Sequence, residues 1–188
     1  MTRYAGKSWR AFRPGAVQAV IRAAPQARVL GLDPGSQRTG FGIIDCGGGA
    51  ERHVCSGCIE VSGAQMVARL QRIYAAIRTL VDEHRPDVIA IERVFIHRNP
   101  DSALKLGQAR GVALCAAATL GASVHEYAPR AIKLAVTGFG GAAKPQVALM
   151  VRTLLKLPGT PRADAADALA VALCHAQTRR LSSLGAVA

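Results

Sequence analysis

Residues 28–45 read RVLGLDPGSQRTGFGIID, and this stretch decides the fold. Two short apolar runs, Arg28–Asp33 and Gly40–Asp45, lie on either side of turn residues at 34–36. Apolar runs around a Pro-Gly turn predict two strands joined as a hairpin. The first strand then carries an acidic residue, Asp33, at its carboxyl end.

Downstream of the hairpin, the sequence predicts alternating strands and helices. The expected elements are a strand at His53–Val61, a helix at Met66–Glu83 stopped by Pro86, a strand at Asp87–Glu92, a helix capped by Asp101 and Ser102 and running to about Leu120, a strand at Ser123–Tyr127, and helices at about Gln146–Leu155 and Ala163–Thr178. For the last helix, Thr160 is the expected cap and Pro161 the first helical residue. This order predicts a single α/β domain with a mixed five-stranded sheet flanked by helices.

The composition of the chain indicates which class of molecule it binds. The chain has 188 residues, half of them apolar, and 24 Lys and Arg against 12 Asp and Glu give a net charge of +12. Such an excess predicts a polyanionic partner, nucleic acid first. Apolar stretches fall short of the roughly 20 residues of a membrane helix. Five cysteines, an odd number, without a secretory segment favour a reducing compartment, and we expect a cytoplasmic protein.

The two ends of the chain are expected to differ from its body. Six basic residues precede Asp33, the first acid, so the rest of the chain keeps 18 basic residues against 12 acidic ones. We predict a flexible basic extension at 1–26, a folded domain at 27–180 and a short tail at 181–188. The extension has the Arg-rich, acid-free composition of an organelle transit peptide but little serine, so a start codon placed too far upstream or a floppy basic extension is an equal alternative.

Four acidic residues lie at positions where a negative charge is either unfavourable because of desolvation or close to a second negative charge. Asp33 and Glu92 end apolar strands, where a carboxylate pays a desolvation penalty unless a cation or hydrogen bonds compensate. Asp164 and Asp167 are three residues apart in the first turns of the last helix, hence on one face. Acids also occur there merely to stabilise the helix dipole. Taken together, four hard oxygen ligands favour Mg²⁺ or Mn²⁺, and pairs of such ions catalyse phosphodiester hydrolysis.

The motifs LGLDPGSQRTGFGIID, AIERVF, NPDSALKLGQARGVAL and MVRTLLKLPGTPRADAADALA, in this order, resemble the RuvC family of Holliday-junction resolvases. The resemblance covers about Arg28 to Thr178. It implies a ribonuclease-H-like fold, a homodimer, and paired Mg²⁺-dependent cuts in a four-way DNA junction during recombination and repair. It also implies two Mg²⁺ per subunit, with Mn²⁺ as a substitute, 5′-phosphate and 3′-hydroxyl ends, and cooperation with a branch-migration motor. The matching acidic tetrad is Asp33, Glu92, Asp164 and Asp167.

The same resemblance implies DNA-binding roles for Lys133, Lys144 and Phe95, since ammonium groups bind phosphates and an aromatic ring stacks on a base. Solvated lysines and a core phenylalanine are the plain alternatives. The segment with His97, Arg98 and Pro100 departs from the family pattern. So does Pro145, which stiffens an expected mobile lid at Gly138–Lys144.

Gly107 and Gly111 are four residues apart on one helix and leave one face without side chains. This face fits either a dimer contact or close packing against the protein's own sheet, and the resemblance favours the dimer.

Other readings of the chain are weaker. Cys55 and Cys58 have the spacing of a zinc pair, but without a second pair we expect free thiols. Residues 138–144 fail the sequence requirement of a phosphate loop. His175 is expected to be a packed or solvated side chain. An actin-like ATPase or sugar kinase also opens with such a turn, but those chains are about twice as long. A non-catalytic junction-binding module would leave the four acids unexplained.

Overall fold

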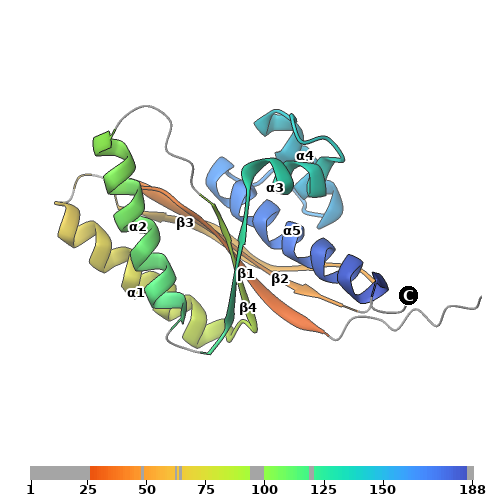
Figure 1. The fold of residues 1–188 in the computed structure, drawn as a ribbon, viewed down its shortest axis with the longest axis horizontal. Coiled ribbons are helices and arrows are strands. Elements are labelled where there is room, and N and C mark those ends of the chain that lie inside the picture. Colours follow the sequence, from red (N-terminus) through yellow and green to blue (C-terminus); the bar gives the residue numbers. More distant parts are fainter. Residues whose placement is uncertain are drawn as a thin grey trace, which may run out of the picture.

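The computed structural model describes residues 26–47, 49–61, 63, 65–93, 100–118 and 121–185. Its centre is one mixed five-stranded sheet in the order β3-β2-β1-β4-β5 (Figure 1). The strands are β1 (Ala27–Pro34), β2 (Arg38–Cys46), β3 (Arg52–Glu60), β4 (Val88–Glu92) and β5 (Ser123–Tyr127). The hairpin β1–β2 and the pair β2–β3 are antiparallel, while β1–β4 and β4–β5 are parallel. The predicted fold class is therefore confirmed.

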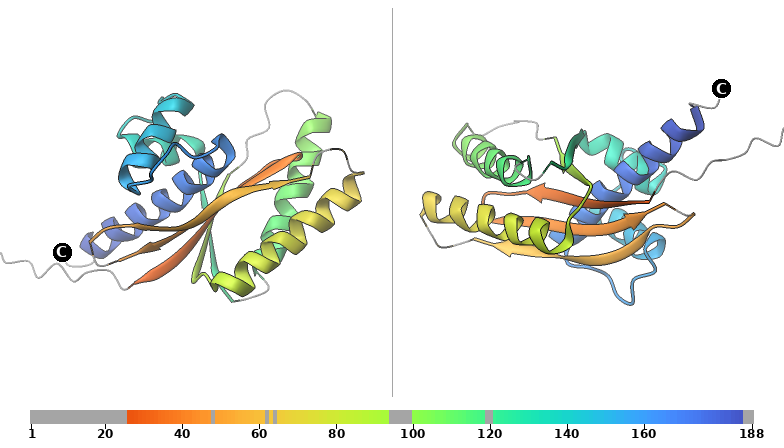
Figure 2. Two further views of the ribbon diagram at one scale, coloured as in Figure 1. Left: turned by 180° about the vertical axis from the view of Figure 1, so that it is seen from behind. Right: turned by 90° about the horizontal axis from the view of Figure 1, so that it is seen from below.

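Helices cover both faces of this sheet. They are α1 (Met66–His84), α2 (Pro100–Ala118), α3 (Pro129–Thr137), α4 (Lys144–Leu154) and α5 (Ala163–Gly185). Figures 1 and 2 show α1 and α2 on one face and α5, with α3 and α4 beside it, on the other. Strand β1 alternates between the two layers: Leu30 and Leu32 pack toward α1 and α2, and Val29 packs toward α5. All three side chains are fully buried.

Helix α5 lies directly on the backbone of β1 and β2, which sets the position of its acidic residues. A Cβ atom added to Gly31 would stand 2.1 Å from the carbonyl oxygen of Ala168, and one added to Gly40 would stand 2.0 Å from that of Asp164. Only glycine permits this approach. The start of α5 is thereby held against the sheet next to the carboxyl end of β1.

The structure differs from the predicted elements in three places. Helix α3 was not predicted, although Pro129 stands in its first turn and Gly138 ends it with φ of 75°; at nine residues, it buries only Ile132 and Val136. Helix α5 begins at Ala163, where its predicted range begins, but the predicted cap and first helical residue at 160–161 are wrong.

The amide of Ala166 bonds to the carbonyl of Arg162, which makes Arg162 the residue from which α5 starts. At its other end α5 continues to Gly185, five residues beyond the boundary predicted for the tail. Among the described helices, none has the length and apolar character needed to cross a membrane.

Candidate active site

The carboxyl ends of β1 and β4 place two acidic side chains next to each other. The strands are parallel and pair Leu32 with Ile91, so Asp33 and Glu92 follow at the same edge of the sheet. Helix α5, which packs on one face of the sheet, contributes Asp167 to the same place. These acids share a cleft of about 150 Å³ with two lysines, and its lining is Asp33, Glu92, Asp167, Lys133, Lys144, Pro129, Ile132, Val147, Ala170 and Val171. Three acids and both lysines predicted from sequence are thus together.

Negative charge in this cleft exceeds what its surroundings neutralise. Burial, and then the charge of Asp167, raise the pKa of Asp33 above its usual value. Burial, and then the charge of Asp33, raise the pKa of Glu92 to about 7. A hydrogen bond between the two carboxyl groups favours the proton on Glu92, since it raises the pKa of Glu92 and lowers that of Asp33. Such a cluster favours a bound cation.

Lys144 supplies part of the missing positive charge. Its Nζ lies 2.7 Å from Oδ2 of Asp167, and this hydrogen bond raises the pKa of the ammonium group. The lysine side chain is 76% exposed, so it can leave Asp167 for another anion without losing packing. Lys144 begins helix α4, where the Ala143 amide donates to Oε1 of Gln146 at 2.8 Å. Lys133 reaches the cleft from α3.

Asp164 points elsewhere. Its Oδ2 lies 3.6 Å from Sγ of Cys58 on β3, and it does not line the cleft. Three residues along a helix amount to a rotation of about 60° between side chains, which is enough to separate Asp164 from Asp167. The structure brings three of the four predicted acids together and leaves the fourth beside β3. Within the described residues, no group of three His, Cys, Asp or Glu side chains is placed, as it stands, so that it could hold a metal ion.

Other predicted residues have different outcomes. Phe95, His97 and Arg98 lie outside the described residues. Gly107 and Gly111 have no atom within 4 Å of an added Cβ, so the alternative that they pack against the protein's own sheet is wrong.

The two cysteines of β3 do not form a pair. Cys55 lies opposite Ile43 and contacts His84 Nε2 at 3.4 Å, whereas Cys58 lies opposite Gly40 and contacts Asp164. Positions opposite residues 43 and 40 lie on opposite faces of the sheet. Both thiols are free, as predicted, with one toward each helical layer, but they are half-buried and not buried as the sequence suggested.

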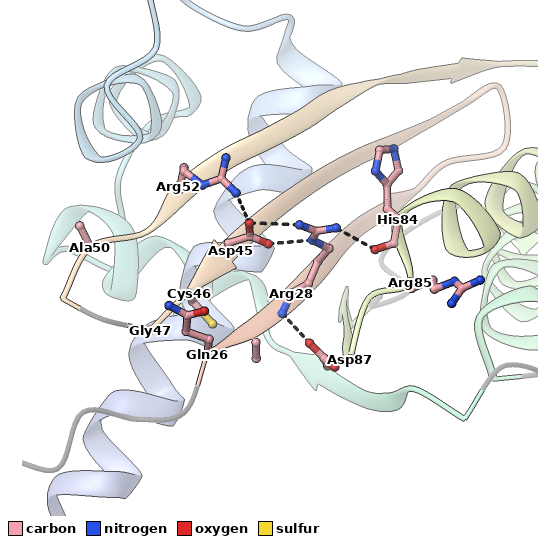
Figure 3. Close-up of a pocket in the computed structure, with 11 residues that line it drawn as sticks. Gln26, Arg28, Asp45, Cys46, Gly47, Ala50, Arg52, His84, Arg85 and Asp87 are labelled. Atoms are coloured by element: carbon pink, nitrogen blue, oxygen red, sulfur yellow. Dashed lines mark hydrogen bonds and ion pairs between the residues drawn. The ribbon is translucent and has the colours of Figure 1, made fainter.

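A larger cavity, of about 590 Å³, lies at the amino end of β1. Figure 3 shows Arg28 at its centre. The guanidinium group donates to both oxygens of Asp45 and to the carbonyl of His84, and the Arg28 amide donates to Asp87 at 2.7 Å. Arg52 also pairs with Asp45. Because Asp45 already has two cationic partners, this cavity lacks the excess charge of the acidic cleft and is the weaker candidate.

Comparisons with known proteins agree on one family. The model of the family "Crossover junction endodeoxyribonuclease RuvC" matches residues 29–175. A relative of this name from Pseudoalteromonas atlantica is 54% identical over 152 residues, which is 81% of this chain and 88% of the relative. Another, from Alkalilimnicola ehrlichii, is 53% identical over 148 residues, 79% of this chain and 90% of the relative.

Solved structures give the same result. Thermus thermophilus RuvC in complex with a Holliday junction substrate is similar with a TM-score of 0.78 and 37% sequence identity, over 84% of this chain and 97% of that one. The yeast mitochondrial Holliday junction resolvase is 12% identical with a TM-score of 0.62 over 86% of this chain and 83% of that one, which shows a shared fold.

Proposed function

Because the chain belongs to the RuvC family of crossover junction endodeoxyribonucleases, we propose that it cuts four-way DNA junctions at the cleft formed by Asp33, Glu92 and Asp167. The reaction is hydrolysis of a phosphodiester bond in DNA recombination and repair. One observation carries the assignment of the site: three carboxyl groups from β1, β4 and α5, far apart in sequence, converge on one cleft with two lysines.

The donor set of the cleft fits a hard divalent cation. Carboxylate oxygens are the ligands that Mg²⁺ and Mn²⁺ prefer, whereas soft metals prefer the thiol and imidazole ligands that this cleft lacks among the described residues. Burial, and then the charges of the neighbouring carboxylates, raise the pKa values of Asp33 and Glu92, which supports a cation as their partner. We assign Asp33, Glu92 and Asp167 as ligands, with Asp164 as a fourth after rotation of its side chain. Two Mg²⁺ ions per subunit are the proposed number.

When bound there, Mg²⁺ supplies positive charge that activates the attacking water and stabilises the departing 3′ oxygen. The protein's own groups do the rest. Asp33 and Glu92 would hold the cation from the sheet, and Asp167 would hold it from α5, whose position depends on close packing over the glycines of β1 and β2. Apolar side chains such as Ile132 and Val147 limit water in the cleft.

The lysines are assigned to the DNA backbone. Lys144 would exchange Asp167 for a phosphate oxygen, and Lys133 would bind the same strand from α3. Phe95 follows β4 by three residues and is proposed to stack on a base of the junction. Both assignments rest on the family resemblance together with the two lysines in the cleft.

The experiment that tests this function uses a labelled four-way junction and a linear duplex of the same sequences. With Mg²⁺ we expect paired cuts in the junction, ends that a ligase can seal, and little cutting of the duplex. Cleavage of both substrates at equal rates would argue against a junction resolvase. Binding of ATP in calorimetry without any cleavage would favour the actin-like alternative.

We further propose that α2 forms the contact of a homodimer. Gly107 and Gly111 are open, and Leu104 is 63% exposed on the same helix although it is apolar. Placing leucine at Gly111 should give monomers in analytical ultracentrifugation, while Gln71→Leu on an exposed position of α1 should not. A dimer of unchanged stability in the Gly111→Leu variant would refute the contact. Cooperation with a branch-migration motor and a cytoplasmic location remain predictions.

A further inference from the structure

The loop between α3 and α4, residues 138–143, exposes an aromatic side chain. Phe139 in this loop is 65% exposed to solvent. The helices on either side of the loop carry the two lysines of the cleft, Lys133 on α3 and Lys144 at the start of α4. The exposed ring therefore lies in the segment that joins the two residues assigned to the DNA backbone.

Hydrogen bonds hold the backbone of Phe139 beside the Lys133 side of α3. The hydroxyl of Thr137 accepts from the Phe139 amide at 3.1 Å, and it lies 2.8 Å from the carbonyl of Lys133. Thr137 follows Lys133 by four residues, so both lie on one side of the helix. The Phe139 carbonyl accepts from the amide of Ala142 at 3.1 Å, and Ala142 is buried. The backbone at Phe139 is thereby fixed next to the side of α3 that lines the cleft.

The ring of Phe139 is held in place without being covered. A Cβ atom added to Gly141 would stand 2.8 Å from Cζ of Phe139, so the ring lies against the backbone of its own loop. Arg130, three residues before Lys133 on the same side of α3, lies against Gly140, where an added Cβ would stand 2.8 Å from its Cγ. An aromatic surface of restricted orientation thus lies beside cationic side chains. This combination is typical of surfaces that bind unpaired nucleotides.

We propose that Phe139 stacks on a base of the DNA strand whose phosphates Lys133 and Lys144 bind. The inference rests on the proposed function, because it requires DNA in the cleft. A base that leaves the duplex near the cleft loses its stacking neighbours, and an aromatic ring replaces them. Phe95 follows β4 in the sequence, whereas Phe139 lies between the two lysines, so Phe139 is a further contact and not an alternative to Phe95.

The first test is affinity for a labelled four-way junction, measured by gel shift without Mg²⁺. Phe139→Ala should weaken binding about ten-fold, as expected for the loss of one stacked base. Phe139→Leu, which is apolar but has no ring, should weaken it as well, and Phe139→Tyr should keep the parental affinity. The thermal midpoint of each variant should remain that of the parent, because the ring is exposed.

Leu149→Ala is the matched control. Leu149 is apolar and 56% exposed, and it lies two residues after Val147, which lines the cleft. Two residues along a helix amount to a rotation of about 200°, so Leu149 lies on the side of α4 away from the cleft. This variant should bind the junction as the parent does.

Tryptophan fluorescence distinguishes stacking from a general loss of affinity. The chain has one tryptophan, Trp9, which is first replaced by phenylalanine. In that Trp9→Phe background, the junction should quench the fluorescence of the Phe139→Trp protein, which should bind with the parental affinity. Fluorescence of the Leu149→Trp protein should stay unchanged.

Parental affinity of the Phe139→Ala protein, or an unquenched Phe139→Trp protein that still cuts the junction, would overturn the inference and leave the proposed function intact. A changed sedimentation coefficient of Phe139→Ala with unchanged junction affinity would also overturn it, because the ring would then contact a second copy of the chain. If the parent protein itself does not bind the junction, the proposed function fails, and the stacking role of Phe139 fails with it.

Discussion

The two ends of strand β1 carry opposite electrostatic arrangements. At the amino end, Arg28 holds both oxygens of Asp45, and a second arginine, Arg52, pairs with the same carboxylate. Those contacts keep the pKa of Asp45 below its usual value. At the carboxyl end, Asp33 lies next to Glu92 and Asp167, and its pKa is raised above the usual value. Lys144 forms a hydrogen bond with Asp167 there.

The difference supports a structural role for the amino end and the proposed catalytic role for the carboxyl end. The Arg28 contacts join β1 to β2 and to the loop before β4. Each charged group in these contacts has a partner of opposite charge or a hydrogen bond. In the acid cluster, by contrast, part of the negative charge has no positive partner, which lowers stability. Proteins keep such clusters mainly at sites where a cation or a substrate binds. The larger cavity lies at the amino end, and the proposed catalytic groups lie at the carboxyl end.

Neutralising the carboxyl end should have the largest effect on activity. Asp33→Asn removes one proposed metal ligand without changing side-chain shape, and we expect cleavage of the junction to fall by about a thousand-fold or more. The same change relieves repulsion from Asp167, so the thermal midpoint in metal-free buffer should not decrease. Affinity for the junction in a gel shift should equal or exceed that of the parent.

Asp45→Asn is the matched control at the amino end of β1. It should lower the thermal midpoint while the folded fraction still cleaves at the parental rate. A folded Asp33→Asn protein that cuts at a near-parental rate would contradict the comparison at its functional end. Glu92→Gln should behave as Asp33→Asn does.

Acid should destabilise the region beside the amino end of β1 through His175. This side chain is 5% exposed, its Nδ1 lies 2.8 Å from the hydroxyl of Tyr127, and its Nε2 has no hydrogen-bond partner. Burial, and then the charges of His125 and Arg179, lower its pKa to about 4. Between pH 6.5 and 4 the unfolded chain binds the proton more readily, so this contribution to the free energy of unfolding is complete above pH 6.5 and falls as the pH decreases toward 4.

At 1.36 kcal/mol per pH unit, the full span corresponds to about 3 kcal/mol. The measurement is urea denaturation of the parent and of His175→Gln between pH 4 and 7. Since the two proteins share all other titrating groups, the difference between their curves isolates this histidine. A difference that does not change with pH would show that the imidazole titrates normally.

Removing the contacts of Arg28 at the amino end of β1 should lower stability moderately and leave cleavage activity unchanged. Arg28→Met keeps the aliphatic stem but loses the contacts to Asp45 and to the His84 carbonyl. Both partners of the ion pair are about one-third exposed, so we expect a loss of about 1 to 2 kcal/mol rather than the value of a buried pair. Chemical denaturation measures it. Unchanged stability together with weaker junction binding would instead make Arg28 a DNA contact.

Much of the fold follows from sequence because its strands bury one or both faces. The run at 28–33 has apolar residues for both layers, and the turn after it has the residues that a hairpin needs. Helix α3 escaped prediction because nine residues with two buried side chains give little periodicity. The start of α5 involves a tertiary contact, since Arg162, whose carbonyl accepts the hydrogen bond from Ala166, pairs through its side chain with Glu60 of β3.

The site was predictable in part. Asp33 and Glu92 end strands, and parallel strands bring their carboxyl ends to one edge, so their meeting follows from order alone. That Asp164 lies beside Cys58 does not, because it depends on how α5 rotates over Gly40. The only sequence signal for Cys58 was a spacing typical of zinc pairs, which indicated a different chemistry. That Cys58 lies opposite Gly40 could be found only from the register of β2 and β3.

The smallest expected effect comes from removing residues 1–25, which precede the amino end of β1. They contain five basic residues and no acid, while every group of the cleft lies downstream. Their deletion should therefore leave the rate of junction cleavage and the thermal midpoint unchanged. Nonspecific affinity for duplex DNA should decrease a few-fold, and the salt dependence of binding should become shallower by at most about 4.5 in the log–log slope, since each of five phosphate contacts would contribute about 0.9. Filter binding at several salt concentrations measures both. Loss of cleavage or of folding in this truncation would show that the amino end of β1 is not purely structural and that its preceding residues serve the site.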